Sequence, residues 1–262
     1  MRGVAVVDAS AVIYADYPPD PQAIEGWASH QKILVILAHP DDPEFFMGAT
    51  LKRWALLGHE IHYCLLTTGQ KGSLDGKISV TELSETRISE QKAAAEKLGI
   101  KSVQFLDYVD GEVIPDLEMR KKLIRVMRQV RPDVVVSSDP LNYFPSGSNR
   151  VNHPDHRAAG QAVLDALFPG AGNPMFFPEL ISVEGLHPVD IRELWFSIPS
   201  EANLVIDISA YYQIKLDVIV CHRSQIGPDE EEFRSMISDH WAVIDEKGQP
   251  TYFERFRRII FH

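Results

Sequence analysis

Short continuous apolar runs alternate with longer amphipathic segments along the first two thirds of the chain. Apolar runs rich in Val, Ile and Leu are typical of strands buried on both faces of a parallel sheet, and the amphipathic segments are long enough for helices. Ser79 with Glu82 forms a candidate capping box, and Gly58 and Gly99 mark helix ends. The predicted strands are 33–38, 60–67, 103–106 and 133–137, and the predicted helices are 46–57, 79–98, 117–130 and 154–167.

This order predicts an α/β protein with a Rossmann-like, three-layer α/β/α architecture and a mostly parallel sheet. We expect the first four strands in the order 3-2-1-4, which places the ends of strands 33–38 and 133–137 side by side. Open α/β sheets bind ligands at such a switch point. The remainder is less regular, with strands expected at 180–183, 194–197 and 204–206 and helices at 209–220 and 229–242.

Length and composition restrict the domain number and the class of partner. A chain of 262 residues, 45% of them hydrophobic, suits one large domain, 31–262. The proline-rich turn at 17–21 sets apart an N-terminal extension, 1–30. The net charge of −11 is unsuited to phosphate backbones, so we expect no nucleic-acid partner.

The same sequence argues against a membrane span and a secretory leader. No apolar run reaches the roughly 18–20 residues that a transmembrane helix needs. Asp8 interrupts the apolar start of the chain, and a secretory signal tolerates such a charge poorly. We therefore expect a cytoplasmic protein in which the two cysteines, Cys64 and Cys221, are buried, reduced thiols.

Two clusters of metal-ligating residue types follow strands 33–38 and 133–137. The first is His39-Pro40-Asp41-Asp42, in which neighbouring side chains point in different directions. One carboxylate of this turn can therefore bind a metal together with the imidazole while the other acts as a base. The second cluster is Asn152-His153-Pro154-Asp155-His156.

Pro154 suits the first position of a helix, which makes His153 the N-cap and places His156 in the first turn. Two imidazoles and one carboxylate with an open fourth position are typical of catalytic zinc, and the chain has no Cys-x-x-Cys pair for a structural zinc. Both histidines can face the same ligand, so the residues alone leave open which of them binds it. The chain also lacks a G-x-G-x-x-G dinucleotide fingerprint, a P-loop and a G-x-S-x-G nucleophile elbow.

At these residues the chain resembles the PIG-L/LmbE family of zinc-dependent N-deacetylases, whose mark is Ala-His-Pro-Asp-Asp-Glu with a later His-Pro-Asp-His. The resemblance covers residues 32–225, and Pro43 stands where the motif carries glutamate, with Glu44 following. It extends to the segments Thr67-Thr68-Gly69-Gln70-Lys71-Gly72-Ser73, Arg87 with Glu90, Asp110-Gly111 and His222-Arg223-Ser224-Gln225.

The resemblance implies a role for each matching residue. It implies one Zn²⁺ per chain, with His39, Asp42 and His156 as its ligands. Asp41 is then the general base, and His153 stabilises the oxyanion or protonates the leaving amine. Arg87 and Asp110 are expected to hold sugar hydroxyls.

The implied reaction is hydrolysis of an N-acetyl group from a small amino-sugar-type substrate. Two alternatives stay open: an amidase for a thiol conjugate or another small N-acylated molecule, and a catalytically silent sugar-binding protein. Asp41 argues against the second, because binding alone does not need that carboxylate. The aromatic and basic segment 253–262 is interpreted either as an edge strand or as a subunit contact in a homo-oligomer.

Overall fold

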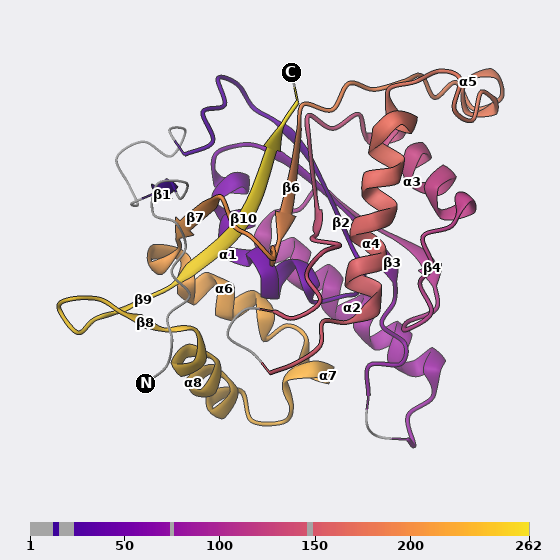
Figure 1. Cartoon of the computed structure of the whole chain (residues 1–262). Coiled ribbons are helices and arrows are strands. Elements are labelled where there is room, and N and C mark those ends of the chain that lie inside the picture. Colours follow the sequence, from indigo (N-terminus) through magenta and orange to yellow (C-terminus); the bar gives the residue numbers. More distant parts are fainter. Residues whose placement is uncertain (1–12, 16–23, 74–75, 146–148, 262) are drawn as a thin grey trace.

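The structure is a computed structural model that describes residues 13–15, 24–73, 76–145 and 149–261, so the proline-rich turn at 17–21 lies outside the described residues. A Rossmann-like α/β fold is present, with helices on both faces of a central sheet (Figure 1). The strands are β1 Ile13–Ala15, β2 Lys32–Leu37, β3 Glu60–Thr67, β4 Ser102–Tyr108, β5 Val134–Ser138, β6 Glu193–Ser197, β7 Leu204–Asp207, β8 Val243–Ile244, β9 Pro250–Thr251 and β10 Phe253–Ile260. The helices are α1 Asp42–Leu56, α2 Val80–Leu98, α3 Leu117–Val130, α4 Pro154–Asp165, α5 Glu179–Ser182, α6 Tyr212–Ile219, α7 Arg223–Ile226 and α8 Glu230–Trp241, with a π-helical turn at Ala166–Ala171 and a 3-10 turn at Ser209–Tyr211.

The central sheet has eight strands in the order β1-β7-β10-β6-β5-β2-β3-β4, and β8 and β9 form a separate hairpin. β10 is antiparallel to both of its neighbours, whereas the pairs among β2, β3, β4, β5 and β6 are parallel. The order β4-β3-β2-β5 confirms the predicted 3-2-1-4 arrangement. From β2 the chain adds β3 and β4 on one side and then crosses back to place β5 on the other side of β2, so the loops that follow β2 and β5 lie together.

β2 is buried on both faces because its alternate side chains enter two different core layers. Ile33, Val35 and Leu37 pack with residues of α1, α2 and α6, whereas Leu34 and Ile36 pack with residues of α3 and α4. The helices thus cover the two faces of the sheet as separate layers (Figure 1). This arrangement explains why the strand appears in the sequence as a continuous apolar run.

α1 begins at Asp42, four residues earlier than predicted, and it is kinked at Met47 (φ −152°). The apolar periodicity in the sequence therefore marks only the part of the helix that follows the kink. Pro43 lies in the first turn, where its missing N–H costs nothing. Just after the kink, the carboxylate of Glu254 accepts the N–H groups of Ala49 (3.2 Å) and Thr50 (2.9 Å).

Two predictions about individual segments are wrong. Residues 180–183 were expected as a strand but belong largely to the short helix α5, because an apolar run of four residues does not distinguish the two structures. The C-terminal segment is not an edge strand, since β10 pairs with β6 on one side and β7 on the other. A subunit contact through this segment stays a prediction.

The described part of the N-terminal segment packs against the core. The Trp27 ring lies 5.5 Å from that of Trp54 and 5.9 Å from that of Trp195. The Glu25 carboxylate accepts hydrogen bonds from Arg53 and from the Trp54 indole (2.9 Å). The boundary between the extension, 1–30, and the domain, 31–262, stays a prediction.

Two further predictions concern the cysteines and the membrane. Cys64 and Cys221 are both free thiols, and Cys64 is buried in β3 as expected, whereas Cys221 is only partly buried. Among the described residues, no helix combines the length and the apolar character that a membrane crossing requires.

Candidate metal centre and active site

The two predicted clusters meet at the carboxyl ends of β2 and β5. His39 and Asp41 lie in the turn between β2 and α1, and Asp42 is the first residue of α1. His153 is the N-cap of α4 and His156 lies in its first turn, as expected from Pro154. Strand order, rather than closeness in the chain, brings these loops into contact across more than a hundred residues.

Three of these side chains, those of His39, Asp42 and His156, form a triad with the spacing of a metal site. His39 Nδ1 lies 3.3 Å from His156 Nε2 and 3.5 Å from Asp42 Oδ2, and His156 Nε2 lies 3.0 Å from Asp42 Oδ1. Zn–N and Zn–O bonds of about 2.0–2.1 Å in a tetrahedron require ligand atoms roughly 3.3–3.4 Å apart. The two imidazole nitrogens and the two Asp42 oxygens therefore lie at about the spacing that a tetrahedral metal site requires of its ligands.

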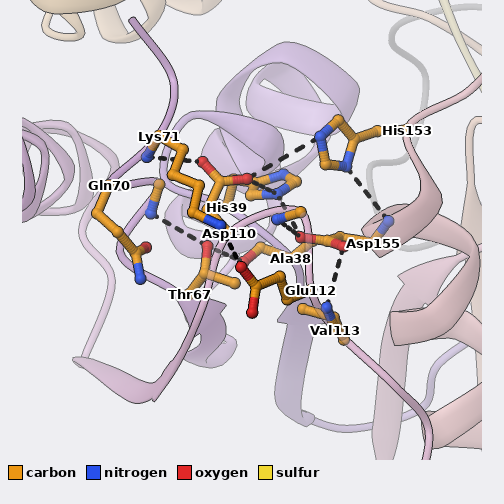
Figure 2. A network of polar contacts seen from close by, with 12 residues as sticks. Ala38, His39, Thr67, Gln70, Lys71, Asp110, Glu112, Val113, His153 and Asp155 are labelled. Carbon is orange, nitrogen blue, oxygen red and sulfur yellow. Dashed lines mark hydrogen bonds and ion pairs between the residues drawn. The ribbon is translucent and has the colours of Figure 1, made fainter. Parts of the chain in front are cut away.

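Partners behind the triad orient both imidazoles. Asn152 Oδ1 lies 2.9 Å from His156 Nδ1, which leaves the Nε2 lone pair for a metal. His39 Nε2 lies 3.2 Å from both Asp110 Oδ1 and Asp155 Oδ2, so its Nδ1 faces the triad. Figure 2 shows the His39 ring between these two carboxylates. Burial lowers the pKa of His39, but its carboxylate partners raise it well above the usual value, so the donor set attracts positive charge.

Asp155 was not assigned a role from the sequence, although it lies inside the quoted His-Pro-Asp-His segment. Its buried carboxylate accepts the N–H groups of Gly111 (2.7 Å) and Val113 (3.3 Å) in addition to its contact with His39 (Figure 2). His39, Asp110, His153 and Asp155 form a second group of metal-ligating residue types. Because its carboxylates already accept backbone hydrogen bonds, we interpret this group as the support of His39.

Asp41 lies beside the triad in an unusual backbone conformation (φ 84°, ψ −32°). Its carboxylate Oδ2 accepts a hydrogen bond from Arg87 Nη2 (3.2 Å), and its backbone N–H donates to Gln91 Oε1 (2.9 Å). Burial raises the pKa of Asp41 to about 6, and the Arg87 guanidinium opposes this shift. The site thus contains a buried carboxylate outside the triad whose pKa lies above the usual value of an aspartate.

Arg87 is buried and donates to the carbonyls of Gly69 (3.0 Å) and Pro40 (2.8 Å) as well as to Asp41. The loop after β3 closes tightly over this guanidinium. A Cβ atom at Gly69 would lie 2.4 Å from the guanidinium carbon, and one at Gly72 would lie 2.2 Å from Nη1. Arg87 therefore joins two loops of the site, and its expected contact with a sugar hydroxyl stays a prediction.

The two remaining predicted site residues, Asp110 and His153, both lie against the His39 side chain. Asp110 accepts the backbone N–H of Lys71 (3.1 Å), and its Oδ1 lies 4.0 Å from His153 Nε2 (Figure 2). The His153 side chain is 40% exposed, and its Nδ1 accepts the N–H of Asp155 (3.2 Å). Burial and the neighbouring imidazoles lower the pKa of His153.

The sequence did not predict individual roles for three buried residues around Asp41. Glu44, Gln91 and His222 form a polar cluster whose members have no exposed surface. Glu44 and His222 lie in segments covered by the family resemblance, and that resemblance was the only sequence feature that pointed to them. Gln91 lies in the middle of α2 and has no such signal.

Comparison with known proteins identifies the family. Residues 34–167, half of the chain, match the PIG-L family, described as GlcNAc-PI de-N-acetylase. The chain belongs to this family. The matched region contains the triad, Asp41, Arg87, Asp110 and His153.

Individual relatives extend this family match. The diacetylchitobiose deacetylase of Thermococcus kodakarensis is 36% identical over 200 residues, which cover 76% of this chain and 72% of the relative. A probable N-acetyl-alpha-D-glucosaminyl L-malate deacetylase 2 of Bacillus cereus is 28% identical over 84% of this chain and 91% of its own. The structure of N,N'-diacetylchitobiose deacetylase from Pyrococcus horikoshii superposes with a TM-score of 0.79 at 31% identity, covering 92% of this chain and 87% of that one.

Proposed function

We propose that this PIG-L family protein is a zinc-dependent N-deacetylase that hydrolyses the N-acetyl group of a small amino-sugar-type substrate. One observation carries the proposal: His39, Asp42 and His156 bring metal-ligating atoms together, and Asp41 lies beside this triad without belonging to it. The deacetylases of N-acetylated sugars among the relatives support the choice of substrate class.

The donor set supports zinc as the metal, with one ion per chain. Two imidazoles and one carboxylate suit Zn²⁺, whereas Mg²⁺ and Ca²⁺ prefer oxygen ligands. When bound, the ion supplies Lewis-acid activation of a water molecule and of the amide carbonyl. His39, Asp42 and His156 would hold it, while Asp155 and Asn152 keep the two imidazoles oriented.

The other residues perform proton transfer and charge stabilisation. We propose that Asp41 accepts the proton of the attacking water, and that Arg87 keeps this carboxylate ionised near neutral pH. His153 is the most exposed imidazole of the site. It donates a hydrogen bond to the developing oxyanion or a proton to the departing amine. Acetate and the free amine are the products.

Arg87 and Asp110 were predicted to hold sugar hydroxyls. Both polar groups are engaged within the protein, so we propose that a substrate approaches them at the loop they anchor, 69–72. An amide of a thiol conjugate would use the same triad and base. Substrate profiling separates it from an N-acetylated sugar.

The test measures acetate release from N-acetylglucosamine and N,N'-diacetylchitobiose, and release of the free amine from an N-acylated thiol conjugate. Protein stripped with a chelator is compared with the same protein after addition of one equivalent of Zn²⁺. We expect activity on a sugar that follows the zinc content up to one ion per chain. Full activity of the stripped protein, or binding of these sugars without any acetate release, contradicts the proposal.

A further inference from the structure

A closed polar cluster lies directly behind Asp41, and the proposed chemistry does not use it. Glu44, Gln91 and His222 are fully buried and come from three helical segments: α1, α2 and the start of α7. Glu44 Oε2 lies 3.2 Å from His222 Nε2, and Glu44 Oε1 lies 3.0 Å from Gln91 Nε2. Burying polar groups is costly unless they are paired, so this cluster requires an explanation.

The chemistry of the donors sets the direction of every bond in the cluster. Carboxylate oxygens accept, so His222 Nε2, the Tyr63 hydroxyl (3.3 Å) and Gln91 Nε2 donate to Glu44. The Gln91 amide group is therefore fixed with its carbonyl oxygen on the opposite side. That oxygen accepts the backbone N–H of Asp41 at 2.9 Å.

Asp41 has a backbone conformation that needs such a restraint. Its φ of 84° lies in the left-handed region, which non-glycine residues rarely adopt unless their surroundings hold them there. The carbonyl of Asp41 accepts the N–H groups of Glu44 and Phe45 (3.0 Å each), which ties it to α1. The N–H group is restrained from the other side by Gln91 alone among the described residues.

His222 makes this contact at a cost to its own hydrogen bonding. Within the described ranges, its buried Nδ1 has no hydrogen-bond partner. Its place is set by the following residues, because Ser224 N and Oγ both bond to the Glu90 carboxylate on α2 (2.7 Å each). Among the described residues, the Glu44 carboxylate is the hydrogen-bond partner of this ring.

We propose that His222, Glu44 and Gln91 form a positioning relay that holds the backbone N–H of Asp41 and thereby aims its carboxylate at the reacting water. This inference rests on the proposed role of Asp41 as the base. None of the three residues touches the substrate or the metal in this scheme. The relay acts through the orientation of the Gln91 amide, which the Glu44 carboxylate determines and His222 supports.

The relay is tested with Gln91→Leu, His222→Leu and His222→Gln. Gln91→Leu removes the acceptor for Asp41, and His222→Leu removes a donor to Glu44. In His222→Gln the amide nitrogen takes the place of Nε2, so this variant keeps the donor. Arg128→Met is the matched control, because Arg128 is also buried but donates to the carbonyls of Gly170 and Asn173, which belong to the segment after α4.

Two measurements are made on the zinc-loaded proteins. Hydrogen exchange followed by mass spectrometry should show about tenfold faster exchange at Asp41 in the two leucine variants, as expected for the loss of one hydrogen bond. With N,N'-diacetylchitobiose, their kcat should fall about 10- to 100-fold with little change in KM or in zinc content, because a misaimed group slows the chemical step. His222→Gln and Arg128→Met should keep both the exchange rate at Asp41 and the kcat of wild type.

The exchange measurement separates the relay from the proposed function. Unchanged exchange at Asp41 in Gln91→Leu and His222→Leu overturns the relay, whatever the activity. A loss of kcat in Arg128→Met equal to that in the leucine variants also overturns it, since general loosening would then explain the effect. If the leucine variants speed exchange but wild type releases no acetate from any sugar, the relay stands as a restraint on Asp41 and the proposed function fails.

Discussion

Replacement of Arg87 by methionine should move the acidic limb of the pH–rate profile to higher pH. Arg87 Nη2 lies 3.2 Å from Asp41 Oδ2, and both side chains are largely buried. Burial raises the pKa of Asp41 to about 6 and the guanidinium lowers it, so removing Arg87 raises it further. A base works only when deprotonated, and a higher pKa therefore means lost activity on the acidic side.

The magnitude follows from the charge pair. One opposite charge at this distance lowers a carboxyl pKa by roughly 1–3 units. Starting from about 6, Arg87→Met brings Asp41 to roughly 7–9. At pH 7 the deprotonated fraction then falls from about nine-tenths to between one half and about one hundredth, so kcat/KM falls roughly 2- to 100-fold. A bound dication lowers the pKa of Asp41 in both proteins, so the shift between variants is the quantity to measure.

The assay is kcat/KM for acetate release between pH 5 and pH 10, using wild type, Arg87→Met and Arg87→Lys. Arg87→Lys keeps the positive charge, so the midpoint of the acidic limb should stay close to that of wild type. The lysine cannot make all the contacts that Arg87 makes with the carbonyls of Gly69 and Pro40. Activity of Arg87→Met should recover as the pH rises above the new midpoint. A loss of equal size at every pH would refute this reasoning and favour a direct contact of Arg87 with the substrate.

Four further substitutions test the assignment of roles around the triad. Asp41→Asn should leave the metal content unchanged in elemental analysis and lower turnover about 10²–10⁴-fold, and an empty site would instead make Asp41 a ligand. His156→Ala should lose metal and activity together, whereas His153→Ala should keep the metal and lower turnover about 10²–10³-fold; the opposite pattern exchanges the two roles. Asp155→Asn weakens the orientation of His39, so a competition titration with a chelating dye should show about 10- to 100-fold weaker metal binding, and unchanged affinity would remove Asp155 from the site.

Local sequence pattern determined much of the fold and the position of the candidate metal site. The strands around the switch point are continuous apolar runs because each is buried on both faces, which periodicity reports directly. Parallel strands present their carboxyl ends at one edge, so the loops containing His39 and His156 had to be close once the order 3-2-1-4 was inferred. Pro154 correctly placed His153 at the N-cap.

The tertiary structure alone decided which polar groups support that site. Asp155 turns toward His39 across 116 positions, and Gln91 reaches Asp41 from the middle of a helix whose sequence marks no special role for it. β10 lies inside the sheet although it comes last in the chain, because pairing between distant strands has no short-range signal. Periodicity and capping act over a few residues, whereas the partners of a buried polar side chain depend on which segments the fold brings together.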